Sequence, residues 1–341
     1  MRCIHVAQID ISMMRHRKTL LCIFCIASIA ACMTNRAISQ SAAGRGAENV
    51  LIPHESWTCG MADGIPNPES GTLVFEAAMK FESVLNVGKT PYGDRQVIVV
   101  QDGTLSGPKL SGTVMPGALD FELKLSNGTI EIEQTLVLRT TDGQYVYVRN
   151  AGTGADTRDV RVVMDFEAPN AGSSAWLNSG KYVARRVFNE STRTLTMRVY
   201  DVSAVTVAAN PASVVRIRKP DGVRNQPGDY RRPDPSEKQG NVLVTETVSL
   251  SPSQTVGASK RGNRNIIPIT GGELSGRISG KVLFGGAEYQ SRPNPPAIDA
   301  RYLWQTSDGT IIIVRNAGSG GLVPTFEVRT DSPSAWLNTG R

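Results

Sequence analysis

Two arginines that end apolar stretches are the first residues whose type and spacing could do chemistry. Arg149 follows the stretch 145–148 (Tyr-Val-Tyr-Val), and Arg315 follows the stretch 311–314 (Ile-Ile-Ile-Val). If both stretches are strands at the mouth of a barrel, each guanidinium could clamp a carboxylate or an enolate of a ligand through two parallel hydrogen bonds. The favoured alternative is a structural ion pair with an acidic side chain of the preceding strand.

Glu133 and Asp299 are those acidic side chains, since they occupy matching positions one strand before the two arginines. Burial in a barrel lumen would raise the pKa of either carboxyl and suit it to general acid–base catalysis. Glu131 and Glu133 share one face of their strand, however, and two carboxylates in a row are more typical of a solvated face. Both interpretations stay open at the level of the sequence.

Trp176 and Trp336 stand in a repeated motif, Ser-Ala-Trp-Leu-Asn followed by Ser-Gly or Thr-Gly. A tryptophan offers a large apolar surface with one hydrogen-bond donor, so either ring could form the floor of a ligand pocket. The motif favours the other role, in which the ring plugs one end of a barrel. The candidate ligand-binding residues are thus Arg149, Arg315, Glu133, Asp299, Trp176 and Trp336.

Composition excludes several other kinds of site. Two of the three histidines, His5 and His16, lie in the N-terminal leader, so neither a histidine-rich metal site nor a Ser-His-Asp triad is expected. Cys59 is the one cysteine outside the leader, which rules out a disulfide framework within the chain. The net charge of +6 is too small for a nucleic-acid-binding face. We expect no metal, no cofactor and no nucleic-acid partner.

Three blocks of sequence occur twice, which indicates a duplicated domain. Gly103–Gly107 recurs as Gly272–Gly276, and Val148–Gly154 recurs as Val314–Gly320. The tryptophan motif follows each second block in the same order. A period this long is that of a whole domain rather than of a short solenoid unit.

Strand signals dominate both copies, because apolar and polar residues alternate over residues 73–82 and short local turns separate such runs. About eight or nine strands joined in this way predict an up-and-down antiparallel barrel, with a β-sandwich as the alternative. The stretches 145–148 and 311–314 are apolar on both faces, whereas a strand of a solvated barrel should alternate. We therefore expect the outer face of this strand to be covered, by the other copy or by another protomer.

The repeated motifs resemble the DUF3237 family, also called UPF0311. The residues that carry the resemblance are Gly-x-Leu-Ser-Gly, the Asp-Gly turn, Val-Arg-Asn and Trp-Leu-Asn-x-Gly, and all of them occur twice. The resemblance implies an eight-stranded up-and-down barrel for each copy and brings no catalytic residues with it. The tandem arrangement and the leader depart from the family's usual single domain.

The second copy stops early by comparison with the first. After Gly180 the first copy continues to Val202, long enough for a final hairpin, whereas only Arg341 follows Gly340. Either the sequence is a fragment, or the second barrel is open and another element covers its edge. We therefore predict an all-β protein of two tandem up-and-down antiparallel barrels, the second lacking its C-terminal hairpin.

The N-terminal residues have the pattern of a secretory signal. Basic residues at 15–18 precede an uncharged run, Leu20–Cys32, which is too short to cross a bilayer. The run ends in Ile29-Ala30-Ala31-Cys32, which resembles the lipobox of bacterial lipoproteins, in which the cysteine is lipidated and becomes the mature N-terminus. Ordinary cleavage after Ser39 is the alternative. We expect an exported protein of the cell envelope, held at the membrane by a lipid anchor, or else soluble in the periplasm or secreted.

The expected organisation is a signal peptide at 1–32, a tether at 33–70, a first barrel at 71–207, a Pro-rich linker at 208–240 and a second barrel at 241–341. We expect binding of a small apolar or amphipathic molecule rather than catalysis, because a small barrel can hold one such ligand. One alternative is a cofactor-free isomerase or cyclase, with Arg149 as the anion clamp and Glu133 as the acid–base group. The other is a structural envelope module with packed lumens. A homo-oligomer or barrel–barrel packing is compatible with all three.

Replacing Cys32 tests the expected anchor. Cys32→Ser should move the protein from the membrane fraction to the soluble fraction, because it removes the side chain that receives the lipid. Cell fractionation followed by immunoblotting measures this shift. A wild-type protein that is already soluble and begins at Gln40 would show that the tetrapeptide Ile29–Cys32 is not a lipobox.

Overall fold

The computed structural model describes residues 4–5, 50–51, 64–156, 160–207, 216–217, 240–292, 297–319 and 322–338. The lipobox with Cys32, most of the tether and most of the expected linker lie outside these residues. No helix in the described part of the chain is long and apolar enough to cross a membrane.

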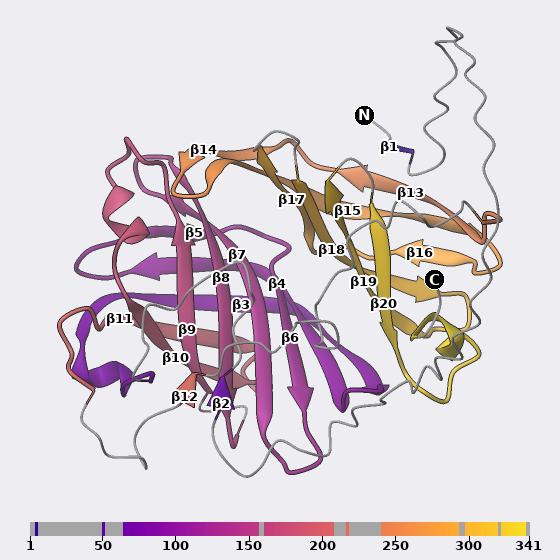
Figure 1. The fold of residues 1–341 in the computed structure, drawn as a ribbon, viewed down its shortest axis with the longest axis horizontal. Helices are drawn as coiled ribbons and strands as arrows, with labels where there is room; N and C mark the ends of the chain where they lie inside the picture. Colours follow the sequence, from indigo (N-terminus) through magenta and orange to yellow (C-terminus); the bar gives the residue numbers. More distant parts are fainter. Residues whose placement is uncertain are drawn as a thin grey trace, which may run out of the picture.

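The fold is all-β, and its two large antiparallel sheets follow the two sequence copies (Figure 1). The first sheet contains β3 (Thr72–Lys89), β4 (Asp94–Ser106), β5 (Gly112–Val114), β6 (Leu119–Lys124), β7 (Ile130–Thr140), β8 (Tyr145–Gly154), β9 (Val160–Glu167), β10 (Tyr182–Asn189) and β11 (Thr194–Asp201). The second contains β13 (Val244–Leu250), β14 (Gln254–Ser259), β15 (Gly262–Gly276), β16 (Gly280–Val282), β17 (Ala287–Arg292), β18 (Ala297–Thr306), β19 (Ile311–Ser319) and β20 (Val323–Val328). The shorter elements are β1 (Ile4–His5), β2 (Val50–Leu51), β12 (Arg216–Ile217) and the 3-10 helices η1 (Pro68–Ser70), η2 (Ala175–Asn178) and η3 (Ala335–Asn338).

The first sheet closes into an up-and-down barrel, as predicted. Its ring runs β3-β4-β6-β7-β8-β9-β10-β11, and β11 pairs back with β3. The short strand β5 bridges β4 and β7 at one end. Alternate residues of the ring strands point into the lumen, and those of every ring strand except β6 form one apolar core, which includes Phe75, Met79, Val148 and Met197.

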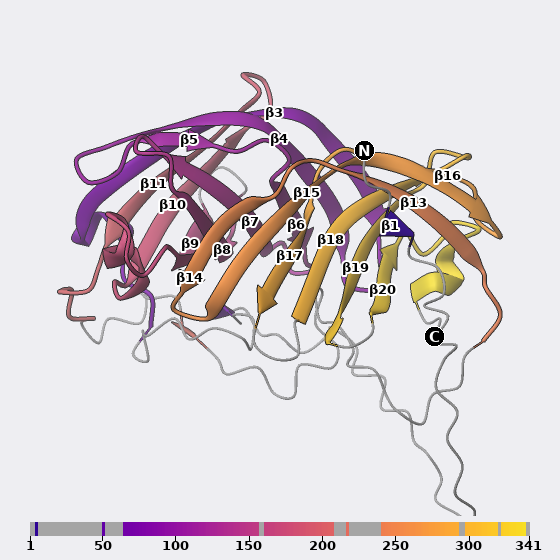
Figure 2. The ribbon, with the colours of Figure 1, turned by 90° about the horizontal axis from the view of Figure 1, so that it is seen from above.

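The second sheet repeats this strand order, and within the described residues its ring is not closed. Strands β15 to β20 correspond to β4 to β9, and β13 with β14 corresponds to β3, interrupted at Pro252, which lacks the N–H of a central strand residue. Among the described strands, β20 pairs only with β19, and β13 pairs on its outer side with Ile4–His5. Figure 2 shows β14 to β20 as one curved sheet beside the barrel.

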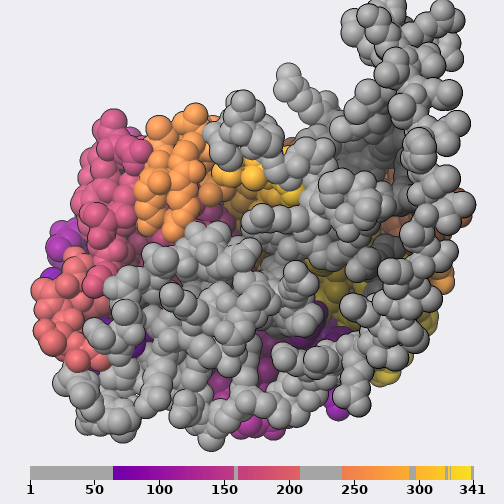
Figure 3. Space-filling model, viewed as in Figure 1, coloured from indigo at the N-terminus to yellow at the C-terminus, as the bar shows by residue number. Residues whose placement is uncertain are grey.

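The outer faces of the two sheets pack against each other. Tyr147 of β8 lies against Tyr289 of β17, with ring centroids 5.0 Å apart. Ile313 of β19 shares an apolar cluster with Phe121 of β6. The strands β8 and β19 are apolar on both faces. The inner face of each strand packs in the core of its own sheet, and the outer face packs against the other copy. At one end of this contact, Asn170 N donates a hydrogen bond to Ala258 O. Figure 3 shows orange surface of the second copy touching pink surface of the first.

The contact between the sheets is reciprocal. Arg95 of the first copy binds Glu327 of the second, with 2.8 Å between Nε and Oε1. Arg264 of the second copy binds Glu167 of the first, with 2.9 Å between Nη2 and Oε1. Arg264 holds the place of Arg95, and Glu327 holds the place of Glu167, in their respective copies. In a two-fold symmetric dimer, position i of one subunit contacts position j of the other, and position j contacts position i in return. The two copies of this chain contact each other in the same way, so the chain contains the equivalent of a dimer.

Separating the two sheets tests how far each depends on the other. Residues 240–341 alone should not form a stable monomer, because they would expose the outer face with Ile311 and Ile313 and the edges of β13 and β20. Residues 64–207 alone should unfold cooperatively, since their barrel is closed, and should dimerise through the uncovered outer face. Circular dichroism melts and size-exclusion chromatography measure both. A monomeric, cooperatively folding 240–341 fragment would contradict this account of the second sheet.

Candidate functional site

The structure places the predicted site residues in two separate regions. Arg149, Arg315, Glu133 and Asp299 lie on outer faces, between the two sheets, and not at a barrel mouth. Trp176 and Trp336 lie on η2 and η3. Neither Arg149 nor Glu133 lines the cavity that contains Trp176.

Glu133 is the centre of an ion-pair cluster between the sheets. Arg315 Nη1 lies 3.0 Å from Glu133 Oε2, and Arg301 Nη1 contacts Glu133 Oε1. Arg301 also binds Asp299, with 2.9 Å between Nη2 and Oδ2. Both guanidinium groups are buried, and two cations face two anions. The cluster therefore neutralises itself within the contact between the sheets, as a structural ion pair does.

Arg149 forms a second cluster at the same contact, around Asp165 of β9. Arg149 Nη2 lies 2.8 Å from Asp165 Oδ2, and Lys260 Nζ approaches the other oxygen to 2.8 Å. Arg261 Nη1 is 2.7 Å from Oδ2. Although burial alone would raise it, the charges of Arg149, Lys260 and Arg261 hold the pKa of the Asp165 carboxyl below its ordinary value. Arg149 is thus paired with a carboxylate on the following strand, β9.

The tryptophan motif closes one end of the first barrel. Asn178 ties η2 to the end of β9, because its Oδ1 accepts from Ala168 N at 2.8 Å and its Nδ2 donates to Ala168 O at 2.9 Å. This clamp inserts Leu177 into the barrel core and lays the half-buried ring of Trp176 over it. The motif therefore plugs the barrel, mainly through Leu177, and leaves part of the indole at the surface.

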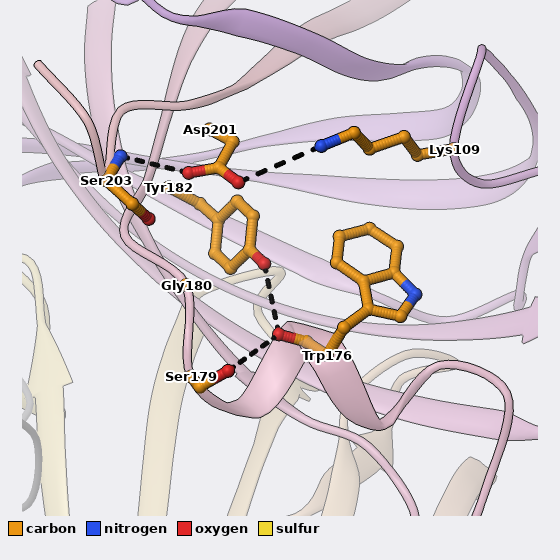
Figure 4. Close-up of a pocket in the computed structure, with 7 residues that line it drawn as sticks. All are labelled: Lys109, Trp176, Ser179, Gly180, Tyr182, Asp201 and Ser203. Carbon is orange, nitrogen blue, oxygen red and sulfur yellow. Dashed lines mark hydrogen bonds and ion pairs between the residues drawn. The ribbon is translucent and has the colours of Figure 1, made fainter.

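A cavity of about 550 Å³ opens beside this indole (Figure 4). The rings of Trp176 and Tyr182 meet edge to face, with centroids 6.2 Å apart. Lys109 Nζ lies 6.0 Å from the Trp176 ring and 4.0 Å from Asp201 Oδ2, and both charged side chains are partly exposed. The remaining lining residues are Ser179, Gly180 and Ser203. The cavity thus combines an aromatic wall with one cation and one anion at its rim.

The second copy keeps the clamp but not the cavity walls. Asn338 binds the backbone of Val328 as Asn178 binds that of Ala168. Tyr182 and Asp201 lie on β10 and β11, and no described strand of the second sheet corresponds to these two. The Arg277 guanidinium lies 4.2 Å from the Trp336 ring centroid instead. Trp336 is therefore a natural comparison for Trp176.

A buried polar network crosses the lumen of the first barrel, and sequence reasoning missed it. Arg186 of β10 reaches across to β6, where its Nε lies 2.9 Å from Asp120 Oδ2 and its Nη2 lies 2.5 Å from Glu122 Oε1. Gln134 Nε2 donates to Asp120 Oδ2 at 2.8 Å, and Asn150 Nδ2 donates to Gln134 Oε1 at 2.7 Å. All five side chains are almost completely inaccessible to solvent.

The network is short of donors and holds an unusual carboxyl group. Asp120 Oδ1 and Asn150 Oδ1 are buried acceptors without a hydrogen-bond partner among the described residues. Burial raises the pKa of the Asp120 carboxyl to about 6, and the neighbouring Glu122 charge adds to this rise while Arg186 opposes it. Such a group titrates near neutral pH inside an otherwise apolar lumen.

A second cavity, of about 340 Å³, lies at the opposite end of the barrel from Trp176. It is lined by Asn86, Gly88, Asp94, Arg95, Gln96, Glu122, Lys124 and Ile130. Gln96 Nε2 donates to Glu122 Oε2 at its inner end, and Asp120 follows Glu122 deeper along the inward face of β6. The cavity therefore ends at the first carboxylate of the lumen network.

The second sheet repeats the positions of the network but keeps only one of the two carboxyl groups at these positions. Asp120, Gln134 and Asn150 are direct neighbours across β6, β7 and β8, and the corresponding row in the second sheet is Glu288, Ala300 and Asn316. Gln290 stands in the place of Glu122, and Asn265 Nδ2 donates to Gln290 Oε1 at 3.2 Å as Gln96 does to Glu122. Among the described residues β20 is the last strand of the second sheet, so none of them holds the place of Arg186 on β10.

The alternation of residues 119–124, Leu-Asp-Phe-Glu-Leu-Lys, explains why the network was missed. This pattern is typical of a strand with an apolar face on the core and a polar face in water. In the barrel the assignment is reversed: Leu119 and Phe121 face the second sheet, and the two carboxylates face the lumen. The one available signal was Arg186, which alternates with Tyr182, Ala184 and Phe188 on an inward face.

Among the described residues, no group of three or more His, Cys, Asp or Glu side chains could hold a metal ion. The sequence profile of the family "Protein of unknown function (DUF3237)" matches residues 70–205 and 239–332, which is most of both copies. A UPF0311 protein of Bradyrhizobium diazoefficiens is 43% identical over 78 residues, which are 22% of this chain and 51% of that protein. The chain thus spans about half the length of the curated relatives it matches most strongly.

Solved structures of similar proteins cover about one copy of the chain. A conserved protein of unknown function from Rhodopseudomonas palustris is 25% identical, with a TM-score of 0.34 over 38% of this chain and 95% of that one. A β-barrel-like protein from Acinetobacter baumannii is 20% identical, with a TM-score of 0.35 over 38% of this chain and 94% of that one.

Replacing Asp120 should change how stability depends on pH. Between about pH 4 and pH 6 the unfolded chain releases a proton that folded Asp120 retains, so this carboxyl makes the fold less stable as the pH rises. In Asp120→Asn, Arg186 stays paired with Glu122, and this pH-dependent loss of stability is removed. The free energy of unfolding of the variant relative to that of wild type should therefore rise by on the order of 2 kcal/mol from pH 4 to pH 7. Urea unfolding across this range measures the difference.

The exposed carboxylate Asp102 of β4 provides the control. Asp102→Asn should change the free energy of unfolding by less than about 0.5 kcal/mol, because its side chain is exposed. If the stability difference between Asp120→Asn and wild type stays constant from pH 4 to pH 7, the buried carboxyl does not titrate in this window.

Proposed function

Because the chain belongs to the DUF3237 family through both of its copies, we propose that its first barrel binds a small amphipathic molecule in the cavity beside Trp176. The observation that carries this proposal is the juxtaposition of the Trp176 and Tyr182 rings with Lys109 and Asp201 around about 550 Å³ of open space. Ligand pockets of this size combine an apolar wall with a few polar groups that fix orientation.

The chemistry of the lining defines the ligand further. The indole and phenol rings favour a flat apolar or aromatic body. Lys109 favours an anionic head group, and its ion pair with Asp201 is long and partly solvated, so a ligand carboxylate or sulfonate can replace Asp201 at little cost. A small apolar molecule with one anionic group satisfies both parts of the cavity.

The isomerase or cyclase alternative gains no support from the geometry. Its two groups, Arg149 and Glu133, are both held in ion pairs between the sheets, away from either end of the barrel. We also propose export to the cell envelope, with a lipid anchor at Cys32, on the sequence pattern alone. In that setting a ligand site on the barrel end would be accessible to small molecules outside the cytoplasm.

Binding of 8-anilino-1-naphthalenesulfonate, an aromatic anion, tests the proposed cavity. Trp176→Ala should weaken binding by about tenfold or more, since it removes the aromatic wall. Trp336→Ala is the matched control, because it removes the corresponding ring from a copy without the cavity, and it should bind as wild type does. Fluorescence titration measures both affinities.

Lys109→Met separates the charged part of the site from the apolar part. It should weaken binding of the sulfonate but not of the uncharged analogue N-phenyl-1-naphthylamine. Native mass spectrometry of the purified protein should also show a retained small molecule that Trp176→Ala loses. Equal losses of sulfonate binding in the Trp176 and Trp336 variants would overturn the proposal.

A further inference from the structure

The lumen network forms a site of its own, distinct from the cavity beside Trp176. We propose that the first barrel binds a small organic ammonium ion through the cavity at its other end, with Glu122 and Asp120 as the anionic groups that receive it. The ligand class follows from three features of the described residues: the missing donors, the net charge of the network and the cavity that ends at Glu122.

The missing donors identify what the site lacks. Asp120 Oδ1 and Asn150 Oδ1 are fully buried acceptors without a partner among the described residues. Leaving such an atom unpaired costs about 1–3 kcal/mol, and more when the group is charged. Each ammonium N–H is a donor, and an ammonium ion offers no acceptor that would compete for the same partners.

The charge of the network selects a cation over a neutral donor. Asp120 and Glu122 bring two negative charges when ionised, and Arg186 supplies one positive charge. Gln134 and Asn150, which complete the inner surface around Asp120, are uncharged. A second cation balances the network and favours the ionised form of Asp120.

The cavity at this end provides the route. Its volume of about 340 Å³ suits a small molecule, and its inner end is formed by Gln96 and Glu122. The Gln96 amide donates to Glu122, so it occupies the position that a ligand N–H would take. An entering ammonium group can replace this amide at Glu122 and so approach Asp120, the next inward residue of β6.

Comparison with the second copy supports a functional role for the network rather than a role in folding. Its row of Glu288, Ala300 and Asn316 keeps one carboxylate and one amide, and Gln290 replaces Glu122. The second sheet thus has the same strand order with Gln290 in the place of Glu122 and Ala300 in the place of Gln134. The complete set in the first barrel is therefore not a requirement of this β topology.

Titration calorimetry with propylammonium, propanol and propionate tests the proposal on the full chain. Propylammonium should bind, propionate should not, and propanol should bind at least about tenfold more weakly than propylammonium. Binding below about pH 6 should release a proton from Asp120, because the added cation lowers the pKa of that carboxyl, which is faced by Glu122 and Arg186. Paired titrations in buffers of different ionisation enthalpy measure this release.

Variants in both copies separate the site from general effects on charge. Asp120→Asn should lose propylammonium binding by at least about tenfold and abolish the proton release. Glu288→Gln, the matched change in the second sheet, should alter neither. Gln96→Ala should strengthen binding, because it removes the amide that competes at Glu122, and it keeps the test decisive if Asp120→Asn folds poorly.

Three results would overturn the proposal. They are unchanged propylammonium binding in Asp120→Asn, equal weakening in Glu288→Gln, and binding of propionate or propanol at least as tight as that of propylammonium. Trp176→Ala should leave propylammonium binding unchanged, since the ring lies at the opposite end of the barrel. This result keeps the test independent of the proposed site beside Trp176.

Discussion

The outer faces of the two sheets must be covered, and this constraint shapes the rest of the structure. Each sheet carries large apolar side chains on the face that a solvated barrel would show to water, such as Phe121 in the first copy and Ile313 in the second. They bury one another, and the exchanged ion pairs Arg95–Glu327 and Arg264–Glu167 fix their register. Because the outer face of β6 is apolar, its polar residues point inward, which is why the lumen holds a charged network.

The two copies share this contact but differ inside. The first barrel is closed, and its described residues hold both cavities and the buried network around Arg186. Within the described residues, the second sheet keeps the strand order, the Asn338 clamp and the outer contacts, and β20 is its last strand. Its inner face carries an apolar cluster of its own, which includes Tyr302 and Trp304.

The sequence was sufficient for the fold and for part of the site. Repeated motifs, period-two alternation and the short second copy predicted a closed barrel followed by an incomplete one, and Trp176 does lie at a cavity. The placement of Arg149 and Glu133 could not be predicted, because alternation shows which residues share a face but not which face is the lumen. Where both faces of a strand are covered, the polarity of its residues does not show which face lines the lumen. For the same reason, the pattern of residues 119–124 did not show that their carboxylates point inward.

The joining of both partners in one chain has a consequence for how such a protein can change. In a dimer of identical chains every substitution occurs twice, so a loss that one half could tolerate is imposed on both. Here each half is encoded separately, and a tethered partner is always present at a high effective concentration. Positions inside one half, such as Glu122 and its counterpart Gln290, can therefore differ between the halves while the outer contact that joins them is kept.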